Sequence, residues 1–123
     1  MFKVVIGGSR EYENYTELRA FVDACLAKVA QEQEICIVSG GCRGTDLLGE
    51  RYAAERGYAV ERHPADWDRY GRSAGPRRNR EMVDAADAVI AFWDGESRGT
   101  RSLVEYAQQQ NKPLRIKKLT GYR

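Results

Sequence analysis

The feature that most constrains the fold of this chain is a regular alternation of short apolar runs with segments of helical periodicity. From Leu18 to Val29, for example, large apolar side chains recur at steps of three and four residues. This alternation predicts an α/β fold, a mostly parallel sheet of about five strands with helices on both faces. Apolar runs of strand length occupy residues 2–6, 35–38, 58–62, 88–92 and 114–116.

Residues suited to helix ends indicate where the helices begin and stop. Pro76 is favoured at a first helical position, and Gly57 suits the C-terminal end of the helix before it. The longest irregular stretch, from His63 to Gly75, is a candidate lid. Helices are expected to begin at Asn14 or Thr16, at Thr45, near Pro76, and at Gly99 or Thr100.

Three glycine-bearing turns follow apolar runs and lead into expected helices. Glycine lets backbone N–H groups approach a bound group closely, and the start of a helix favours an anion. Because ligands of parallel sheets gather at the carboxyl ends of the strands, the turns predict a site for a phosphate-bearing small molecule. The most telling turn is Ser39, Gly40, Gly41, Cys42, Arg43, Gly44, Thr45 and Asp46, and the others occupy residues 7–10 and 97–100.

Size and composition narrow the class of protein. A chain of 123 residues with 42% hydrophobic residues can bury a real core, and one domain over residues 1–123 is expected. No apolar run approaches the roughly 20 residues that a membrane span needs, and the start lacks the pattern of a signal peptide. Cys25, Cys36 and Cys42 have no paired spacing, which predicts reduced thiols in a cytoplasm. A net charge of +2 does not demand a nucleic-acid partner.

Four motifs in order give this sequence a family resemblance. It resembles the SLOG superfamily, the Rossmann-like group that includes the LOG phosphoribohydrolases and the DNA-processing protein A domain, and above all its small YspA-like (YAcAr) branch. The resemblance implies a Rossmann-like three-layer domain that binds a nucleotide or a nucleotide-derived ligand. The motifs are Gly-Ser-Arg at 8–10, Ser-Gly-Gly-x-x-Gly-Thr-Asp at 39–46, Gly-Pro-Arg-Arg-Asn-Arg-x-Met at 75–82 and Trp-x-Gly-x-Ser-x-Gly-Thr at 93–100.

The sequence departs from the LOG enzymes where their chemistry resides. Those enzymes carry Arg-Lys-x-x-Met and, later, a Pro-Gly-Gly-x-Gly-Thr-x-x-Glu loop. Here Arg78 takes the place of the arginine, but Asn79 replaces the lysine. Ser102 or Leu103 stands where the loop's acid is expected, and Glu105 is the next acid. The resemblance therefore implies a ligand more strongly than it implies hydrolysis.

The residues of the turns allow two interpretations each. Thr45 is suited to cap its helix while neighbouring N–H groups receive phosphate. Asp46 would repel phosphate but could accept ribose hydroxyls, or it could only stabilise the helix start. Arg10 could bind phosphate beside Ser9, or it could form a surface salt bridge. Gly40, Gly41 and Gly44 could simply make a tight turn, and Ser97, Gly99 and Thr100 an ordinary helix cap.

The arginines at the start of the third expected helix do not stabilise the helix dipole, because the N-terminal end of a helix favours acidic side chains. Arg78 and Asn79 are therefore expected to contact the ligand, and Arg77 and Arg80 to be solvated or paired with Asp84 or Glu81. Aromatic side chains are more often core than stacking partners, although Trp67 and Trp93 could sandwich a base. His63 lacks metal-ligand spacing with the cysteines, so no metal and no cofactor are expected.

These observations support three hypotheses. The leading one is a cytoplasmic sensor or carrier that binds a nucleotide-like small molecule, with charge from Arg10, Arg43 and Arg78. The second is an N-glycosidic or phosphoribosyl hydrolase, with Asp94, Glu96 or Glu105 as its acid. The third is a single-stranded nucleic-acid binder that uses the segment 69–80. A homo-oligomer is compatible with each, and no membrane partner is expected.

Overall fold

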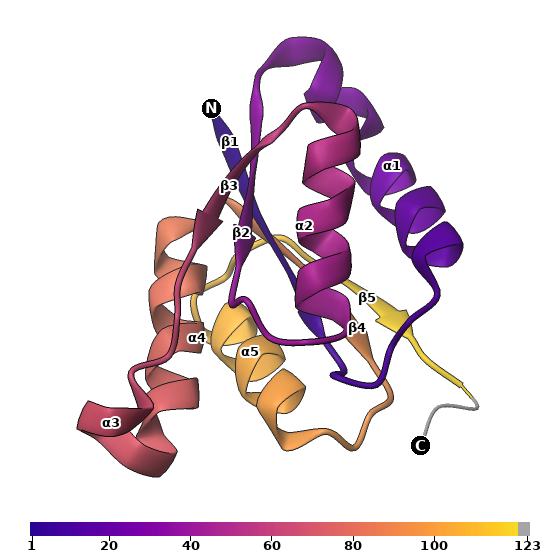
Figure 1. Ribbon diagram of the computed structural model, residues 1–123. Coiled ribbons are helices and arrows are strands. Elements are labelled where there is room, and N and C mark those ends of the chain that lie inside the picture. Colours follow the sequence, from indigo (N-terminus) through magenta and orange to yellow (C-terminus); the bar gives the residue numbers. More distant parts are fainter. Residues whose placement is uncertain (121–123) are drawn as a thin grey trace.

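The computed structural model describes residues 1–120. Its strands form one sheet in the order β3-β2-β1-β4-β5, and all neighbouring strands run parallel. This arrangement confirms the predicted α/β, Rossmann-like architecture (Figure 1). The strands are β1 (Phe2–Gly8), β2 (Ile35–Ser39), β3 (Ala59–Arg62), β4 (Ala88–Trp93) and β5 (Leu114–Lys118).

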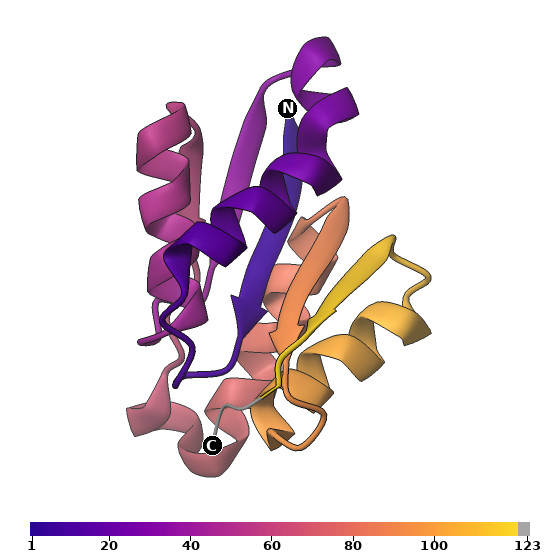
Figure 2. The ribbon, with the colours of Figure 1, turned by 90° about the vertical axis from the view of Figure 1, so that its right-hand side faces the viewer.

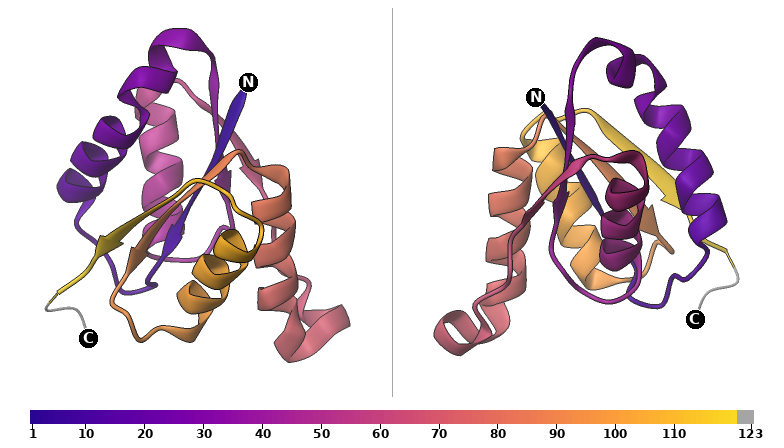
Figure 3. Two further views of the ribbon diagram at one scale, coloured as in Figure 1. Left: turned by 180° about the vertical axis from the view of Figure 1, so that it is seen from behind. Right: turned by 45° about the horizontal axis from the view of Figure 1, so that its top comes forward.

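Helices cover both faces of the sheet, as Figures 2 and 3 show. Strand side chains alternate between faces, so Val4 and Ile6 pack with α1 and α2 on one side. Val5 and Val89 pack with α4 and α5 on the other. The helices are α1 (Tyr15–Glu32), α2 (Thr45–Arg56), α3 (Trp67–Tyr70), α4 (Ala74–Ala85) and α5 (Arg98–Gln109).

Two of the predicted helix ends are confirmed. The Asn14 side chain accepts a hydrogen bond from the Glu17 N–H at 3.1 Å and so caps α1. Gly57 ends α2 in the left-handed conformation, with φ 72°, which glycine adopts without steric cost.

Helix α2 begins at Thr45 as expected, but Thr45 is not its N-cap, because that position is Gly44, with φ 79°. The Thr45 hydroxyl instead donates to the Ser9 carbonyl at 2.9 Å, a partner far away in the sequence. Helix α5 begins at Arg98, one or two residues earlier than expected, and Ser97 occupies its N-cap without a side-chain capping bond.

The segment from His63 to Gly75 is not irregular. It contains α3 and a 3-10 turn (η1, Gly71–Ser73), and α4 already begins at Ala74. The Asp66 carboxylate caps α3 by accepting from the Arg69 N–H at 3.1 Å. Pro76 is tolerated as the third residue of α4 because the first N–H groups of a helix have no partner within it. No helix within residues 1–120 is long and apolar enough to cross a membrane.

Candidate ligand-binding site

The cleft at the carboxyl ends of β1 and β4 is the candidate site. The chain builds β1, β2 and β3 outward in one direction and then returns to add β4 and β5 on the other side of β1. Such a reversal leaves a crevice beyond the strand ends. The cleft has a volume of about 460 Å³ and is lined by Gly7, Gly8, Ser9, Arg10, Glu11, Cys42, Asp46, Arg78, Asn79, Met82, Asp94, Ser97, Gly99, Thr100 and Leu103.

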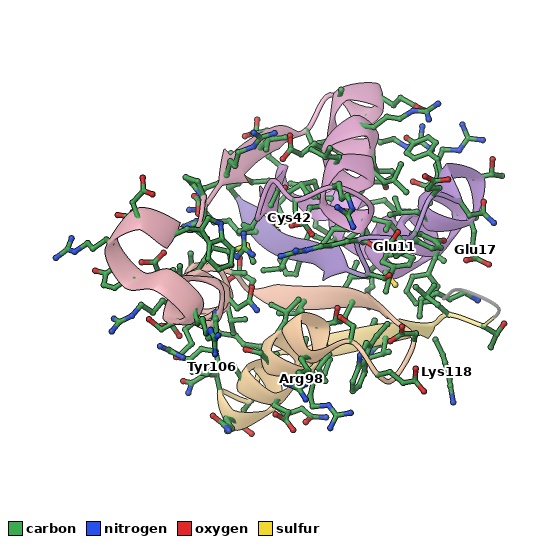
Figure 4. The ribbon with its side chains drawn as sticks, turned by 60° about the horizontal axis from the view of Figure 1, so that its bottom comes forward. Glu11, Glu17, Cys42, Arg98, Tyr106 and Lys118 are labelled. Carbon is green, nitrogen blue, oxygen red and sulfur yellow. The ribbon has the colours of Figure 1, made fainter. Side chains whose placement is uncertain are left out.

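Many of the predicted site residues share this cleft. The predicted residues that line it are Gly8, Ser9, Arg10, Asp46, Arg78, Asn79, Asp94, Ser97, Gly99 and Thr100. Figure 4 looks toward this end of the molecule, with Cys42 and Glu11 on the side of α2 and Arg98 at the start of α5. Within residues 1–120, the predicted residues that lie outside the lining are Ser39, Gly40, Gly41, Arg43, Gly44, Thr45, Glu96 and Glu105.

The end of β1 is held tightly against β4. The Ser9 N–H donates to the Phe92 carbonyl at 2.9 Å. A Cβ at Gly8 would lie 2.1 Å from that same carbonyl oxygen, so only glycine fits here. The next residue, Arg10, is exposed, and within residues 1–120 its guanidinium has neither a hydrogen bond nor an ion pair. The alternative of a surface salt bridge for Arg10 therefore finds no support in the described chain.

The turn between β2 and α2 uses its own N–H groups internally. The Gly41 N–H donates to the Ser39 hydroxyl at 3.1 Å, and the Thr45 N–H donates to the Ser9 carbonyl at 3.1 Å. Arg43 pairs with Glu11 at 2.8 Å on the surface. These donors are thus engaged within the protein, and the turn supports the floor of the cleft.

Asp46 is an acidic residue in the first turn of α2, where the helix favours an anion. It is 7% exposed, and its Oδ2 accepts a hydrogen bond from the Cys42 N–H at 3.2 Å. Burial raises the pKa of Asp46 to about 6, against the hydrogen bond from Cys42 and the charge of Arg78, which lower it. A Cβ at Gly40 would lie 2.8 Å from Asp46 Oδ2, so that glycine makes room for the carboxylate.

Arg78 and Asn79 connect the turns to one another. The guanidinium of Arg78 donates to the Gly40 carbonyl at 2.8 Å and to the Asn79 side-chain oxygen at 3.1 Å. The Asn79 amide donates in turn to the Gly99 carbonyl at 3.1 Å. Both residues are 7% exposed. They therefore position the turns as well as lining the cleft.

The loop before α5 is shaped by Asp94. Its Oδ1 accepts hydrogen bonds from the N–H groups of Glu96 and Ser97, at 2.8 and 2.9 Å. The indole N–H of Trp93 donates to the Ser97 carbonyl at 3.1 Å. Because the N-cap Ser97 makes no side-chain capping bond within residues 1–120, the N–H groups at the start of α5 are available at the cleft.

Sequence reasoning missed several lining residues. Gly7, Glu11 and Cys42 adjoin or interrupt the predicted motifs, so neighbourhood alone could have suggested them. Met82 and Leu103 are apolar, and they pack in the core while also reaching the cleft. Trp67 and Trp93 are not among the described residues that line the cleft.

Fold and site together define a parallel α/β protein with a polar cleft at the reversal point of its sheet. Residues 2–70 match the model of the YspA, cpYpsA-related SLOG family. The Gene 61 protein of Mycobacterium phage D29 is 37% identical over 121 residues, which cover 93% of this chain and 94% of that protein. The chain belongs to the YspA, cpYpsA-related SLOG family.

Two solved structures have the same fold. DNA processing protein A from Helicobacter pylori, described for its single-stranded DNA binding mode, matches with a TM-score of 0.68 and 22% identity. The match covers 98% of this chain and 67% of that one. The structural genomics target TM1055 matches with a TM-score of 0.66 and 23% identity, over 93% of this chain and 72% of its own.

Proposed function

We propose that the cleft binds a nucleotide or a nucleotide-derived ligand through its phosphate, in a sensor or carrier role. The observation that carries this proposal is that the start of α5, which has no side-chain cap, and Arg10, which has no hydrogen bond or ion pair within residues 1–120, line the same cleft. Helix N–H groups and a guanidinium are the donors that proteins use for phosphate. The YspA, cpYpsA-related SLOG family supplies the same expectation from the motifs.

The start of α5 is accessible to such a ligand. A Cβ at Gly99 would meet nothing within 4 Å, so a phosphate can approach the backbone there closely. The hydroxyls of Ser97 and Thr100 lie 3.4 Å apart, and both residues line the cleft. The turn at 40–45 plays a supporting part in this proposal, because the N–H groups of Gly41, Cys42 and Thr45 already have partners.

The geometry favours binding over hydrolysis. Asp94 uses its carboxylate to hold its own loop. Glu96 and Glu105 are exposed and lie outside the lining. An acid that assists departure of a base must reach the glycosidic bond, and these two glutamates lie outside the cleft where such a bond would sit.

Binding to a panel of ribonucleotides, cyclic nucleotides and ADP-ribose derivatives tests the proposal by thermal shift and calorimetry. Loss of a hydrogen bond to a charged group costs about 1.5–3 kcal/mol, so Arg10→Ala should weaken binding by roughly 10-fold to 100-fold. Arg115→Ala is the matched control, since Arg115 is an exposed arginine outside the cleft. Absence of binding across the panel, or equal effects of both variants, contradicts the proposal.

A second candidate function rests on the surface of α3 and the start of α4. Trp67 is 51% exposed. The Arg77 guanidinium lies 4.2 Å from the ring centre of Tyr70, and that of Arg69 lies 5.1 Å from it. The α3 segment projects away from the sheet (Figures 1 and 3). Exposed aromatics beside arginines are the groups that bind single-stranded nucleic acid.

Fluorescence anisotropy with a labelled single-stranded oligonucleotide tests the second candidate. Binding is expected to weaken steeply with salt and to fall in Trp67→Ala, because base stacking contributes about 1–3 kcal/mol. Arg115→Ala is the control, because it leaves the α3 surface unchanged. Phe21→Ala would not serve as an aromatic control, because the Phe21 side chain packs against the core. Absence of binding at low salt removes this candidate and leaves the cleft proposal intact.

A further inference from the structure

We propose that Asp46 selects the sugar of the ligand: its free carboxylate oxygen accepts a hydrogen bond from a ribose hydroxyl, so that the cleft prefers ribonucleotides to their deoxy counterparts. This inference rests on the proposed function and deepens it. It assigns the two sides of the cleft different parts of one ligand.

The carboxylate of Asp46 has one satisfied and one unsatisfied oxygen. Oδ2 accepts from the Cys42 N–H at 3.2 Å, whereas Oδ1 has no hydrogen bond within residues 1–120. The residue is only 7% exposed and lines the cleft. An accessible carboxylate oxygen without a partner in the described chain is an acceptor to which a ligand donor can bind.

Gly7 keeps that oxygen accessible. A Cβ at Gly7 would lie 3.6 Å from Oδ1, in ordinary contact, and Gly7 also lines the cleft. A side chain larger than a methyl group at position 7 would therefore cover the free oxygen. The absence of a side chain at Gly7 leaves Oδ1 open on the side that the ligand would occupy.

The charges around Asp46 favour a neutral donor. Arg78 from α4 and Arg10 from the β1–α1 loop lower the pKa of Asp46, and Glu50 on α2 raises it. A second phosphate is disfavoured by the carboxylate, and a cationic ligand group is disfavoured by the two arginines. The ligand group beside Asp46 is therefore expected to be an uncharged hydroxyl, a donor that an ionised carboxylate binds well.

The two sides of the cleft suit the two ends of one nucleotide. The start of α5 faces it from the side of β4, and Asp46 faces it from the start of α2. The volume of about 460 Å³ lies within the range of about 300–1,000 Å³ that small-molecule sites occupy. A ligand with a phosphate at one end of a hydroxyl-bearing sugar can thus use both sides at once.

The test compares matched ligands on the full chain by calorimetry at pH 7.5. Each of the four ribonucleoside 5′-monophosphates is titrated beside its 2′-deoxy and 3′-deoxy counterparts. Wild-type protein should bind at least one ribonucleotide about 10-fold more tightly than one of its deoxy forms, since the lost bond is to a charged group. In Asp46→Asn this ratio should fall close to one. The asparagine oxygen would accept from the Cys42 N–H in place of Oδ2, and the NH2 group in place of Oδ1 cannot accept a hydrogen bond from a ribose hydroxyl. Arg10→Ala, in contrast, should weaken both members of a pair equally.

Each result decides between the two proposals. A wild-type ratio near one, or an unchanged preference in a folded Asp46→Asn protein, overturns the role of Asp46. If binding still depends on Arg10 in that case, the proposed function stands. Binding of none of the ligands overturns both. The wild-type ratio at pH 5 provides a test without any variant, because protonation of Asp46 should reduce the preference, and a constant ratio contradicts the inference.

Discussion

Replacement of Gly44 by alanine should destabilise the protein more than replacement of an ordinary left-handed glycine, because Gly44 combines a close backbone contact with a backbone conformation that other residues rarely adopt. Gly44 has φ 79°, and a Cβ there would lie 2.5 Å from the Arg10 carbonyl oxygen and 2.6 Å from that of Ser9. Gly57 lies in the ordinary left-handed region, with φ 72° and ψ 24°, whereas ψ of Gly44 is −127°. A Cβ at Gly57 meets nothing within 4 Å, so Gly57→Ala is the reference for a left-handed glycine without a close contact.

The expected magnitudes follow from these two environments. Left-handed backbone costs a non-glycine residue about 1–2 kcal/mol, and this cost applies to Gly57→Ala. The conformation of Gly44 lies in a region that other residues rarely adopt, which costs about 1–3 kcal/mol, and forcing extra atoms into a packed region costs about 1–3 kcal/mol more. We expect losses in the free energy of unfolding of about 2–6 kcal/mol for Gly44→Ala and about 1–2 kcal/mol for Gly57→Ala.

Urea denaturation followed by circular dichroism measures both free energies. Gly44→Ala should also displace Ser9, which accepts from the Thr45 N–H and hydroxyl at 3.1 and 2.9 Å. Binding of a cleft ligand should then weaken in this variant and stay unchanged in Gly57→Ala. Equal losses of stability in the two variants would show that the contact with the β1–α1 loop contributes nothing.

Two further predictions concern carboxylates that support the cleft. Burial raises the pKa of Asp46 from 3.8 to about 6, so between these pH values the folded state binds a proton that the unfolded state has released. The stability of wild type relative to Asp46→Asn should therefore fall by up to about 3 kcal/mol as pH rises from about 4 to about 6, and then level off. A difference in thermal unfolding that does not change with pH contradicts this prediction. Although burial raises the pKa of Glu50, hydrogen bonds from Arg62 and Ser39 hold it below its ordinary value. Glu50→Gln should therefore cost about 1 kcal/mol at pH 7, and that cost should shrink as pH falls below the ordinary pKa; a cost that persists unchanged at pH 3 refutes the role of the charge.

Local patterns were sufficient for the strands and for most helix ends. The run from Leu18 to Val29 predicts a helix because its apolar spacing repeats over several turns, and it lies within α1. Helix α3 was missed because four residues are too few to show a period. Its cap, Asp66, was the one available signal.

Prediction of the site succeeded at the level of segments and not at the level of individual donors. The turns at 7–10 and 97–100 both reach the cleft, because parallel strands present their carboxyl ends at one edge. Residues 40–45 come from an equally suitable turn, yet apart from Cys42 they lie outside the lining among the described residues. Nothing in their local sequence reveals that difference.

The sequence by itself therefore determined which segments are strands, in which order they follow, and that the glycine-bearing turns lie at the carboxyl ends of the strands. Periodicity and glycine placement are local properties, and they are visible in the chain. Only the tertiary structure decided which polar groups remain available. Ser9 accepts the hydrogen bonds of Thr45 across 36 positions, while Arg10, the next residue, stays unpaired in the described chain. Hydrogen-bond partners depend on which distant segments meet, and that is settled only when the sheet assembles.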